Sequence, residues 1–295
     1  MPTLKSRIGV AGEMVRDVGL FPTAKLVCNY ARARLLERRR VRQFRRMKLD
    51  GPTPRTILGS RMTLDPGKAG LDRDLLLDGI REPAATGHLL GLLDAEDVVL
   101  EVGANIGYYA LMEARVCRKV FAVEPHPENL SRLEEHVRLN GRDNIDTHHL
   151  ALGSAPGTVP MFVSSLSNWH SCRESDRGRG GETIEVPCET IDRFASEYET
   201  PTVIKMDVEG FELEVLRGAT ETLPKCRVLF LEFHGDMLSR AEVRELLGII
   251  ARSGLSPSLV AQYDRPGMIK LHDAAHLDRI AAGDRGTYEL FFVRS

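Results

Sequence analysis

Residues 97–109 contain an apolar run, a tight turn and the start of a helix, and this segment limits the fold more than any other part of the chain. The run ends at Glu101, and two glycines four residues apart, Gly103 and Gly107, then flank Asn105. A short apolar run bounded by a turn is typical of a buried parallel strand. Glycine at position 103 allows a sharp turn and the close approach of a ligand, because no Cβ projects there. The segment therefore predicts an α/β fold whose open, mostly parallel sheet binds a ligand beyond its strand ends.

A second strand, over residues 119–124, ends in a carboxylate 21 residues (124 − 103) after Gly103. A carboxylate at this strand tip can accept hydrogen bonds from both hydroxyls of a ribose, so Glu124 is expected to bind a nucleoside. A dinucleotide site needs Gly-x-Gly-x-x-Gly, because a pyrophosphate must lie against bare backbone. Here Asn105 and Tyr108 stand at the second and third glycine positions. The pattern suits a nucleoside with an amino-acid tail, which describes S-adenosylmethionine, and it disfavours an NAD-dependent oxidoreductase.

Two later strands also end in side chains that can take part in chemistry. The first carries Lys205 near its end and Asp207 and Glu209 at its tip, and the second carries Glu232 and His234. Because ligands bind beyond the carboxyl ends of parallel strands, these side chains are expected to face the same crevice as the glycine turn. They are the candidate catalytic residues, since a carboxylate or an imidazole can deprotonate a hydroxyl.

Other roles for these strand-end residues stay open at this point. Carboxylates at such a position can also grip a polar substrate or bind a divalent cation, so the sequence leaves metal dependence undecided. In a purely structural role, Glu209 would cap the following helix and Lys205 would pair with Asp207.

Elsewhere strands alternate with helices, which predicts a parallel sheet. Further strands are expected at residues 145–152, 202–207, 227–233 and 288–293, and helices at residues 72–93, 127–140 and 241–252. A hairpin is expected at residues 56–64, and an antiparallel pair at residues 157–163 and 182–186. The 18 residues between this pair, 164–181, include Asn168, Trp169 and His170, and a loop of that length is typical of a lid or a binding loop.

Together these motifs resemble the FkbM family of S-adenosylmethionine-dependent methyltransferases. The matching segments are residues 101–107, 123–127, 151–153, 204–212 and 231–234, with a weaker match at residues 79–83, where Ile80 replaces an aromatic residue. The resemblance extends over about residues 55–235. It implies a class I methyltransferase Rossmann-like fold, with a mostly parallel seven-stranded sheet and helices on both faces.

The resemblance also implies O-methylation of a hydroxyl on a sugar, a glycan or a polyketide. By the same comparison, the methionine end of the cofactor would be held by Glu101, Gly103, Asn105 and Gly107. Glu124 would hold the ribose, and Leu152 is a further cofactor-binding candidate. Asp207 or His234 would take up the proton of the hydroxyl.

The first 50 residues differ in composition from the rest and are expected to form a basic helical extension. A break at Asp50-Gly-Pro-Thr-Pro54 separates them from a methyltransferase domain at residues 51–295. Residues 31–48 hold nine Arg or Lys and one Glu, although the whole chain has a net charge of −2. Such a helix can lie on an anionic membrane through Arg32–Lys48, bind nucleic acid, or cover the acidic domain. Nucleic acid is disfavoured because the remainder shows no second basic patch, so the expected partner is a small molecule or a glycan.

The five cysteines are scattered and show no C-x-x-C spacing, which indicates reduced thiols. With no signal-peptide pattern at the start of the chain, we expect a cytoplasmic protein that can associate with membranes through its extension. Two alternative functions remain, an RNA methyltransferase that uses the basic helix and a cofactor-binding scaffold without catalysis. The presence of Asp207, Glu209 and His234 argues against the scaffold.

Overall fold

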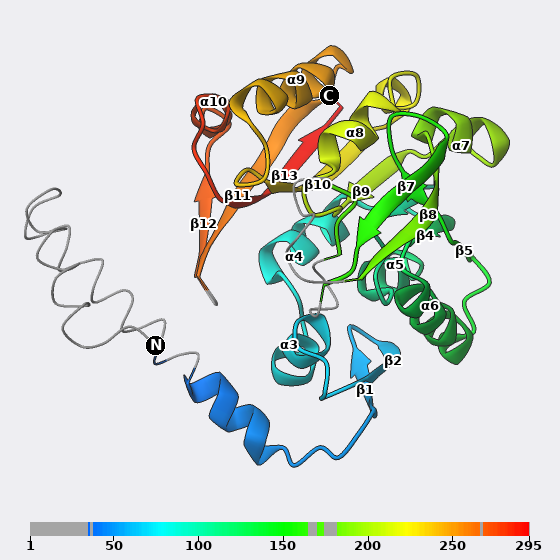
Figure 1. The fold of residues 1–295 in the computed structure, drawn as a ribbon, viewed down its shortest axis with the longest axis vertical. Coiled ribbons are helices and arrows are strands. Elements are labelled where there is room, and N and C mark those ends of the chain that lie inside the picture. Colours follow the sequence, from blue (N-terminus) through cyan, green and yellow to red (C-terminus); the bar gives the residue numbers. More distant parts are fainter. Residues whose placement is uncertain (1–34, 36–37, 165–169, 174–181, 266–267, 295) are drawn as a thin grey trace, which may run out of the picture. The chain divides into compact units, whose positions relative to one another are not determined.

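The computed structural model describes residues 35, 38–164, 170–173, 182–265 and 268–294 (Figure 1). The chain divides into two compact units, residues 1–48 with 265–268, and residues 49–264 with 269–295. In the first unit residues 38–46 are helical, and the side chains of Arg38, Arg39 and Arg42 are exposed. Most of the predicted extension lies outside the described residues, so its boundary at residue 50 stays a prediction. Within the described part of the chain, no helix combines the length and the apolar character needed to cross a membrane.

An eight-stranded sheet with the order β12-β11-β13-β10-β9-β3-β4-β5 forms the centre of the fold. In that order the strands are Met268–His272, Ser256–Arg265, Thr287–Val293, Val228–His234, Val203–Met206, Val98–Val102, Lys119–Val123 and Ile145–His148. β10, β9, β3, β4 and β5 are parallel neighbours. β13 is antiparallel to both β10 and β11, so β11 points the same way as β10. The predicted fold class, a mostly parallel Rossmann-like sheet, is confirmed, and β12 adds an eighth strand at one edge.

Helices cover both faces of this sheet. Figure 1 shows α4, α5 and α6 on one face and α7, α8 and α9 on the other. Their bounds are Pro83–Leu92, Tyr108–Glu113 and Pro127–Asn140 on the first face, and Ile191–Glu197, Glu212–Arg217 and Arg240–Arg252 on the second. The large buried cluster joins strand residues such as Ile204 and Leu229 to Phe194 of α7, Leu216 of α8 and Leu246 of α9. Short elements complete the chain, namely α3 at Leu71–Asp78, a 3₁₀ turn at Leu223–Lys225 and α10 at His276–Ala281.

Two of the expected elements are each divided in the structure. The strand expected at residues 145–152 ends at His148, and β6 (Ala151–Leu152) belongs to a separate three-stranded sheet with β8 and β7. In that sheet β7 (Gly157–Phe162) and β8 (Thr183–Glu189) are antiparallel, as predicted. The helix expected at residues 72–93 is two helices, because Gly79 ends α3 in the left-handed region (φ 67°) and Pro83 begins α4.

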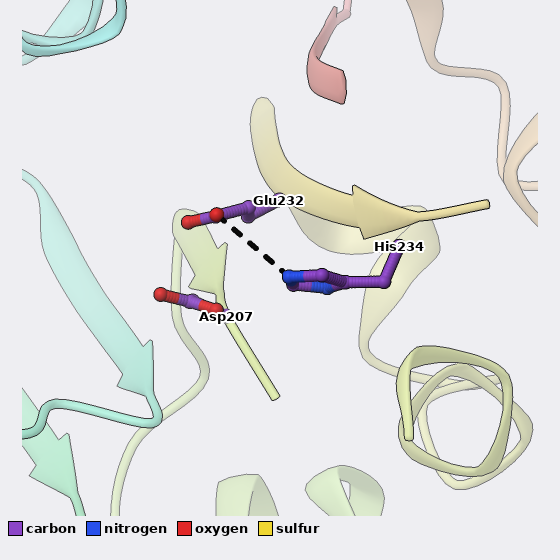
Figure 2. Close-up of side chains that lie close together, drawn as sticks. All are labelled: Asp207, Glu232 and His234. Carbon is purple, nitrogen blue, oxygen red and sulfur yellow. Dashed lines mark ion pairs between the residues drawn. The ribbon is translucent and has the colours of Figure 1, made fainter. Parts of the chain in front are cut away.

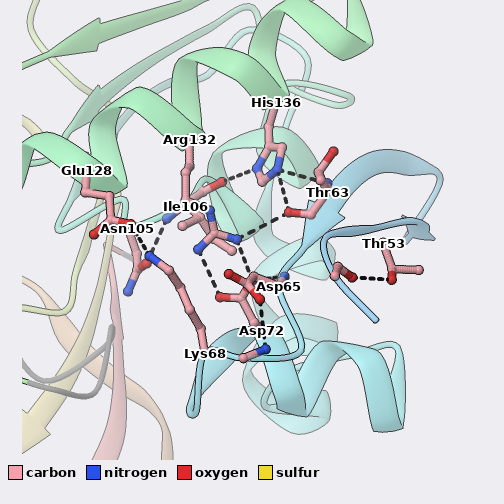
Figure 3. Close-up of polar contacts among 12 residues, drawn as sticks. Thr53, Thr63, Asp65, Lys68, Asp72, Asn105, Ile106, Glu128, Arg132 and His136 are labelled. Carbon is pink, nitrogen blue, oxygen red and sulfur yellow. Dashed lines mark hydrogen bonds and ion pairs between the residues drawn. The ribbon is translucent and has the colours of Figure 1, made fainter. Parts of the chain in front are cut away.

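The segment that precedes the central sheet is fixed to α6 by polar contacts (Figure 3). It begins with the predicted hairpin, β1 (Thr53–Ile57) and β2 (Ser60–Leu64), whose turn residues Leu58 and Gly59 both have positive φ. Arg132 of α6 pairs with Asp72 of α3, which is fully buried. His136 accepts the N–H of Thr63 at 3.0 Å, and its other ring nitrogen lies 2.8 Å from the carbonyl oxygen of Ile106. These contacts hold β2 and α3 beside the turn that follows β3.

Candidate active site

The turn after β3 brings three strand ends together. The N–H groups of Gly103 and Ala104 both donate to the carbonyl oxygen of Val123, at the end of β4. Gly103 has φ +81°, and a Cβ placed there would lie 2.0 Å from the carbonyl oxygen of Asp207, just beyond β9. The need for glycine at this position therefore comes from the packing of strand ends as well as from the turn itself.

Glu124 receives hydrogen bonds from the backbone on both of its carboxylate oxygens. Oε2 accepts the N–H of Asn105 at 2.8 Å, and Oε1 accepts the N–H of His126 at 2.8 Å. The side chain is buried, and burial raises the pKa of Glu124 to about 7, against the opposing effect of these hydrogen bonds. The Asn129 side chain also hydrogen-bonds to this carboxylate, whose remaining lone-pair capacity can accept a hydroxyl group.

A cleft of about 590 Å³, here called the main cleft, opens between the ends of β3, β4 and β9. Four of the predicted cofactor-binding residues line it: Gly103, Asn105, Glu124 and Leu152. Apolar side chains, including Phe211 and Met161, supply much of the remaining wall. Asp207 and Glu209 also line this cleft, whereas Lys205, Glu232 and His234, which were expected to face the same crevice, are not among its lining residues.

Gly107 and Glu101, the other two predicted cofactor residues, do not line the main cleft. A Cβ at Gly107 would lie 2.5 Å from Cδ1 of Leu133, so this glycine allows α5 to pack against α6. Glu101 points into the protein, where Oε1 pairs with Nζ of Lys205 at 2.9 Å, and both side chains are almost fully buried. Their contacts with a cofactor stay predictions.

A second cavity, of about 320 Å³, lies behind the glycine turn and contains this ion pair. It shares Gly103, Asn105 and Asp207 with the main cleft. Lys205 Nζ also lies 4.6 Å from the centre of the Tyr109 ring. Although burial opposes it, the Glu101 and Asp207 carboxylates raise the pKa of Lys205, so the amine stays protonated and cannot accept a proton. Any catalytic effect of Lys205 is therefore electrostatic.

Five acidic or basic side chains at the ends of β9 and β10 form what we call the strand-end cluster: Asp207, Glu209, Glu212, Glu232 and His234. His234 is its centre. Nδ1 of the imidazole lies 2.7 Å from Oε1 of Glu212, and Nε2 lies 3.2 Å from Oε2 of Glu209 and 3.8 Å from Oε1 of Glu232. Figure 2 shows the imidazole pointing toward the carboxylates of Asp207 and Glu232.

The charges in this cluster are strongly interdependent. Burial alone would lower the pKa of His234, but Glu212, Glu209 and Glu232 raise it well above its usual value. Burial alone would raise the pKa of Asp207, but Lys205, His234 and Arg81 lower it. The protein on its own thus holds a cationic His234 and an ionised Asp207. Of the two bases predicted for a hydroxyl, Asp207 is the one whose protonation state fits.

Sequence reasoning missed the contributions of Arg81 and Glu212 to this site. Arg81 comes from the segment between α3 and α4, and its guanidinium lies 2.6 Å from Glu82 and 3.6 Å from Glu232. The match at residues 79–83 was the available signal for Arg81. Glu212 occurs in the matched segment 204–212, but its contact with a histidine 22 residues later is visible only in three dimensions.

The long loop approaches the same site through its described residues. The rings of His170 and His126 stack at 4.2 Å, and His170 lines the main cleft. Ser171 donates its hydroxyl to the carbonyl oxygen of Glu209 at 2.8 Å, and Arg173 donates to that of Gly210 at 3.2 Å. The loop thus supports the backbone that carries Glu209. Asn168 and Trp169 of the same loop lie outside the described part of the chain.

Comparison with known proteins adds the following findings. A sequence model described as a methyltransferase FkbM domain matches residues 101–256, which is more than half of the chain. The chain is similar to the hexuronic acid methyltransferase AglP of Haloferax volcanii, with 31% identity over 156 residues that cover 50% of this chain and 61% of that protein. It is also similar to the 2-O-methyltransferase NoeI of Sinorhizobium fredii, with 26% identity over 213 residues that cover 64% of this chain and 85% of NoeI.

Among solved structures, the methyltransferase FkbM of Methylobacillus flagellatus aligns with a TM-score of 0.45 and 21% identity. The alignment covers 68% of this chain and 45% of that one. The chain thus spans less than two thirds of the length of AglP and of the Methylobacillus protein.

Proposed function

Because the chain belongs to the FkbM methyltransferase family, we propose that it transfers a methyl group from S-adenosylmethionine to a hydroxyl of a sugar, a glycan or a related hydroxylated metabolite. The observation that carries this proposal is the main cleft, whose wall contains the Glu124 carboxylate together with Asp207 and Glu209 of the strand-end cluster. The name of AglP, a hexuronic acid methyltransferase, supports a carbohydrate acceptor, and the name of NoeI, a 2-O-methyltransferase, supports transfer to oxygen.

The residues of the main cleft fit the proposed cofactor. Glu124 would accept the ribose hydroxyls, and the apolar wall formed by Leu152, Phe211 and Met161 suits an adenine ring. The methionine end would lie at Gly103 and Asn105, next to the second cavity. When bound, the cofactor supplies an electrophilic methyl group on a sulfonium.

The chain's own residues must then align the acceptor and manage its proton. Asp207 is the ionised carboxylate that lines both cavities, so it is placed to bind the acceptor hydroxyl. Glu209 and His234 lie beside it and complete a polar pocket suited to a polyol. Lys205 would hold Glu101 and Asp207 in place from the interior.

The test is a transfer assay with S-adenosylmethionine labelled in its methyl group. Acceptors would include free hexuronic acids, neutral sugars, glycans and total RNA, with the Asp207→Asn variant as the control. We expect base-stable label in a carbohydrate with the wild type and a large loss with the variant. Label in RNA alone would favour the RNA methyltransferase alternative. Cofactor binding without transfer to any acceptor class would favour the scaffold.

We also propose that the basic extension, Arg32–Lys48, attaches the protein to anionic membrane from the cytoplasmic side. The helix over residues 38–46 carries exposed arginines along its length, which supports an electrostatic contact of this kind. In a flotation assay, the wild-type protein should be recovered with vesicles that contain phosphatidylglycerol, whereas the triple variant Arg38/Arg39/Arg40→Ala should not. Neither protein should be recovered with neutral vesicles. Equal flotation of the two proteins would contradict this proposal.

A further inference from the structure

We infer that Asp207, Glu232 and His234 form a binding site for one divalent metal cation, with Glu212 as the residue that positions the histidine. The site itself stands on the geometry of the strand-end cluster. Its role in catalysis rests on the proposed function.

The three side chains offer one donor atom each, and these atoms lie within 4.8 Å of one another. Donors that surround one small divalent cation are separated by at most about 4.2 Å, twice a bond length of about 2.1 Å. Donors that are adjacent rather than opposite lie about 3.0 Å apart, so side-chain movements of about 1 Å would close the site. Figure 2 shows that the donors come from two neighbouring strands and face a common centre.

The orientation of His234 is an independent indication of a metal ligand. Its Nδ1 lies 2.7 Å from Oε1 of Glu212, and the same oxygen accepts the N–H of Gly210 at 3.0 Å. Glu212 is thus fixed by the backbone and in turn fixes the ring, which leaves Nε2 directed at the carboxylates. A metal-binding histidine usually donates its other N–H to a carboxylate or a carbonyl in this way.

The carboxylates of Asp207 and Glu232, which lie near Nε2 of His234, have few hydrogen-bonding or cationic partners to offset the cost of burying them. Oδ1 of Asp207 is buried and has no hydrogen-bond partner among the described residues. The Glu232 side chain is only 8% exposed, and its contacts with cations, Arg81 at 3.6 Å and His234 at 3.8 Å, are longer than hydrogen bonds. The carboxyl groups of Asp207 and Glu232 also lie close to each other, an arrangement that a bound cation would stabilise.

The ligand set indicates which class of metal fits. Two carboxylates suit Mg²⁺ and Mn²⁺, whereas the imidazole adds a preference for a transition metal, so Mn²⁺ is the best match and Zn²⁺ the competitor. A cation here would bind the acceptor hydroxyl and lower its pKa. When the O–H bond breaks, the proton would pass to the second carboxylate oxygen of Asp207, which the cation leaves free because each residue supplies one donor atom.

The direct test is Mn²⁺ binding to the purified full-length protein after treatment with a chelator, followed by electron paramagnetic resonance. We expect one bound Mn²⁺ per chain, and affinity at least about 10-fold weaker in Glu232→Gln and in His234→Gln. Glu212→Gln should weaken binding by about 10- to 100-fold because it frees the imidazole. The control is Glu245→Gln, which removes an exposed carboxylate that pairs with Arg217 and should bind as the wild type does.

Thermal unfolding and S-adenosylhomocysteine binding, measured on each variant, would separate loss of the metal site from loss of the fold. Absence of Mn²⁺ binding in the wild type, or equal binding in folded Glu232→Gln and His234→Gln, would overturn the inference. Methyl transfer that persists in excess chelator would overturn the catalytic role of the metal while leaving the proposed function intact.

Discussion

Glu124 and Glu232 are both buried carboxylates at the ends of parallel strands, yet their surroundings differ. Glu124 faces the backbone, and two N–H groups from the adjoining loops hold its oxygens. Glu232 faces other side chains, namely Asp207, Arg81 and His234. Burial raises the pKa of both, to about 7 for Glu124 and well above the usual value for Glu232, where the Asp207 carboxylate adds to the effect.

The difference indicates that cofactor binding and catalysis depend on different residues at the same edge of the sheet. Fixed backbone donors make Glu124 a rigid acceptor that needs only neutral hydroxyls to complete its hydrogen bonds. The strand-end cluster holds more carboxylates than cations, so its charge state depends on what binds there. We therefore expect changes near Glu124 to affect cofactor affinity and changes in the cluster to affect turnover.

The largest effect is expected from Asp207→Asn, which tests whether the strand-end cluster affects turnover without affecting cofactor affinity. Removing the carboxylate that contacts the acceptor should lower kcat by about 10²- to 10⁴-fold. The S-adenosylhomocysteine Kd should stay close to that of the wild type, because the amide keeps the shape of the side chain. Steady-state kinetics and calorimetry test the two halves separately, and undiminished turnover would remove Asp207 from the mechanism.

The ion pair between Lys205 and Glu101 lies between the two regions and should matter chiefly for stability. Lys205→Met leaves Glu101 buried without its partner, beside the buried carboxyl of Glu113, and should cost about 3–5 kcal/mol in the free energy of unfolding. The matched control is Lys119→Met, whose partner Asp146 is about half exposed, with an expected cost of at most about 1 kcal/mol. Denaturant unfolding measures both, and equal costs would contradict the structural role of the pair.

A smaller effect is expected from pH on cofactor affinity. The pKa of Glu124 is raised to about 7, so the carboxyl is mostly protonated below that pH and mostly ionised above it. Because an ionised carboxylate is the stronger acceptor for ribose hydroxyls, affinity for S-adenosylhomocysteine should rise as pH increases, by up to about tenfold between pH 6 and pH 8. Glu124→Gln should abolish this dependence, and its persistence in that variant would assign it to another group.

The motifs that carry chemistry were predictable from the sequence because they follow apolar runs. The ends of β3, β4, β9 and β10 are each marked by an acidic residue after buried aliphatic side chains, and the structure brings these ends together. By contrast, β11 has a proline at its second position, carries polar residues and has an irregular register near Pro257, so it shows no clear strand pattern.

The charge states in the site were not predictable, since they depend on contacts between distant segments. The sequence indicates that His234 follows a strand, but its pKa is set by Glu212 and Glu209, which belong to the preceding strand–helix connection. Likewise, Gly103 predicts a turn from the sequence alone. Its close approach to the Asp207 carbonyl could not be predicted, because it depends on β3 and β9 being neighbours in the sheet.

The most direct test of the central claim is a calorimetric titration of the wild type and of Glu124→Ala with S-adenosylhomocysteine, with NADH as the comparison ligand. We expect micromolar binding of S-adenosylhomocysteine to the wild type, binding at least about 10-fold weaker in Glu124→Ala, and no binding of NADH. Binding of NADH alone, or equal affinity of the two proteins for S-adenosylhomocysteine, would contradict the assignment of the main cleft.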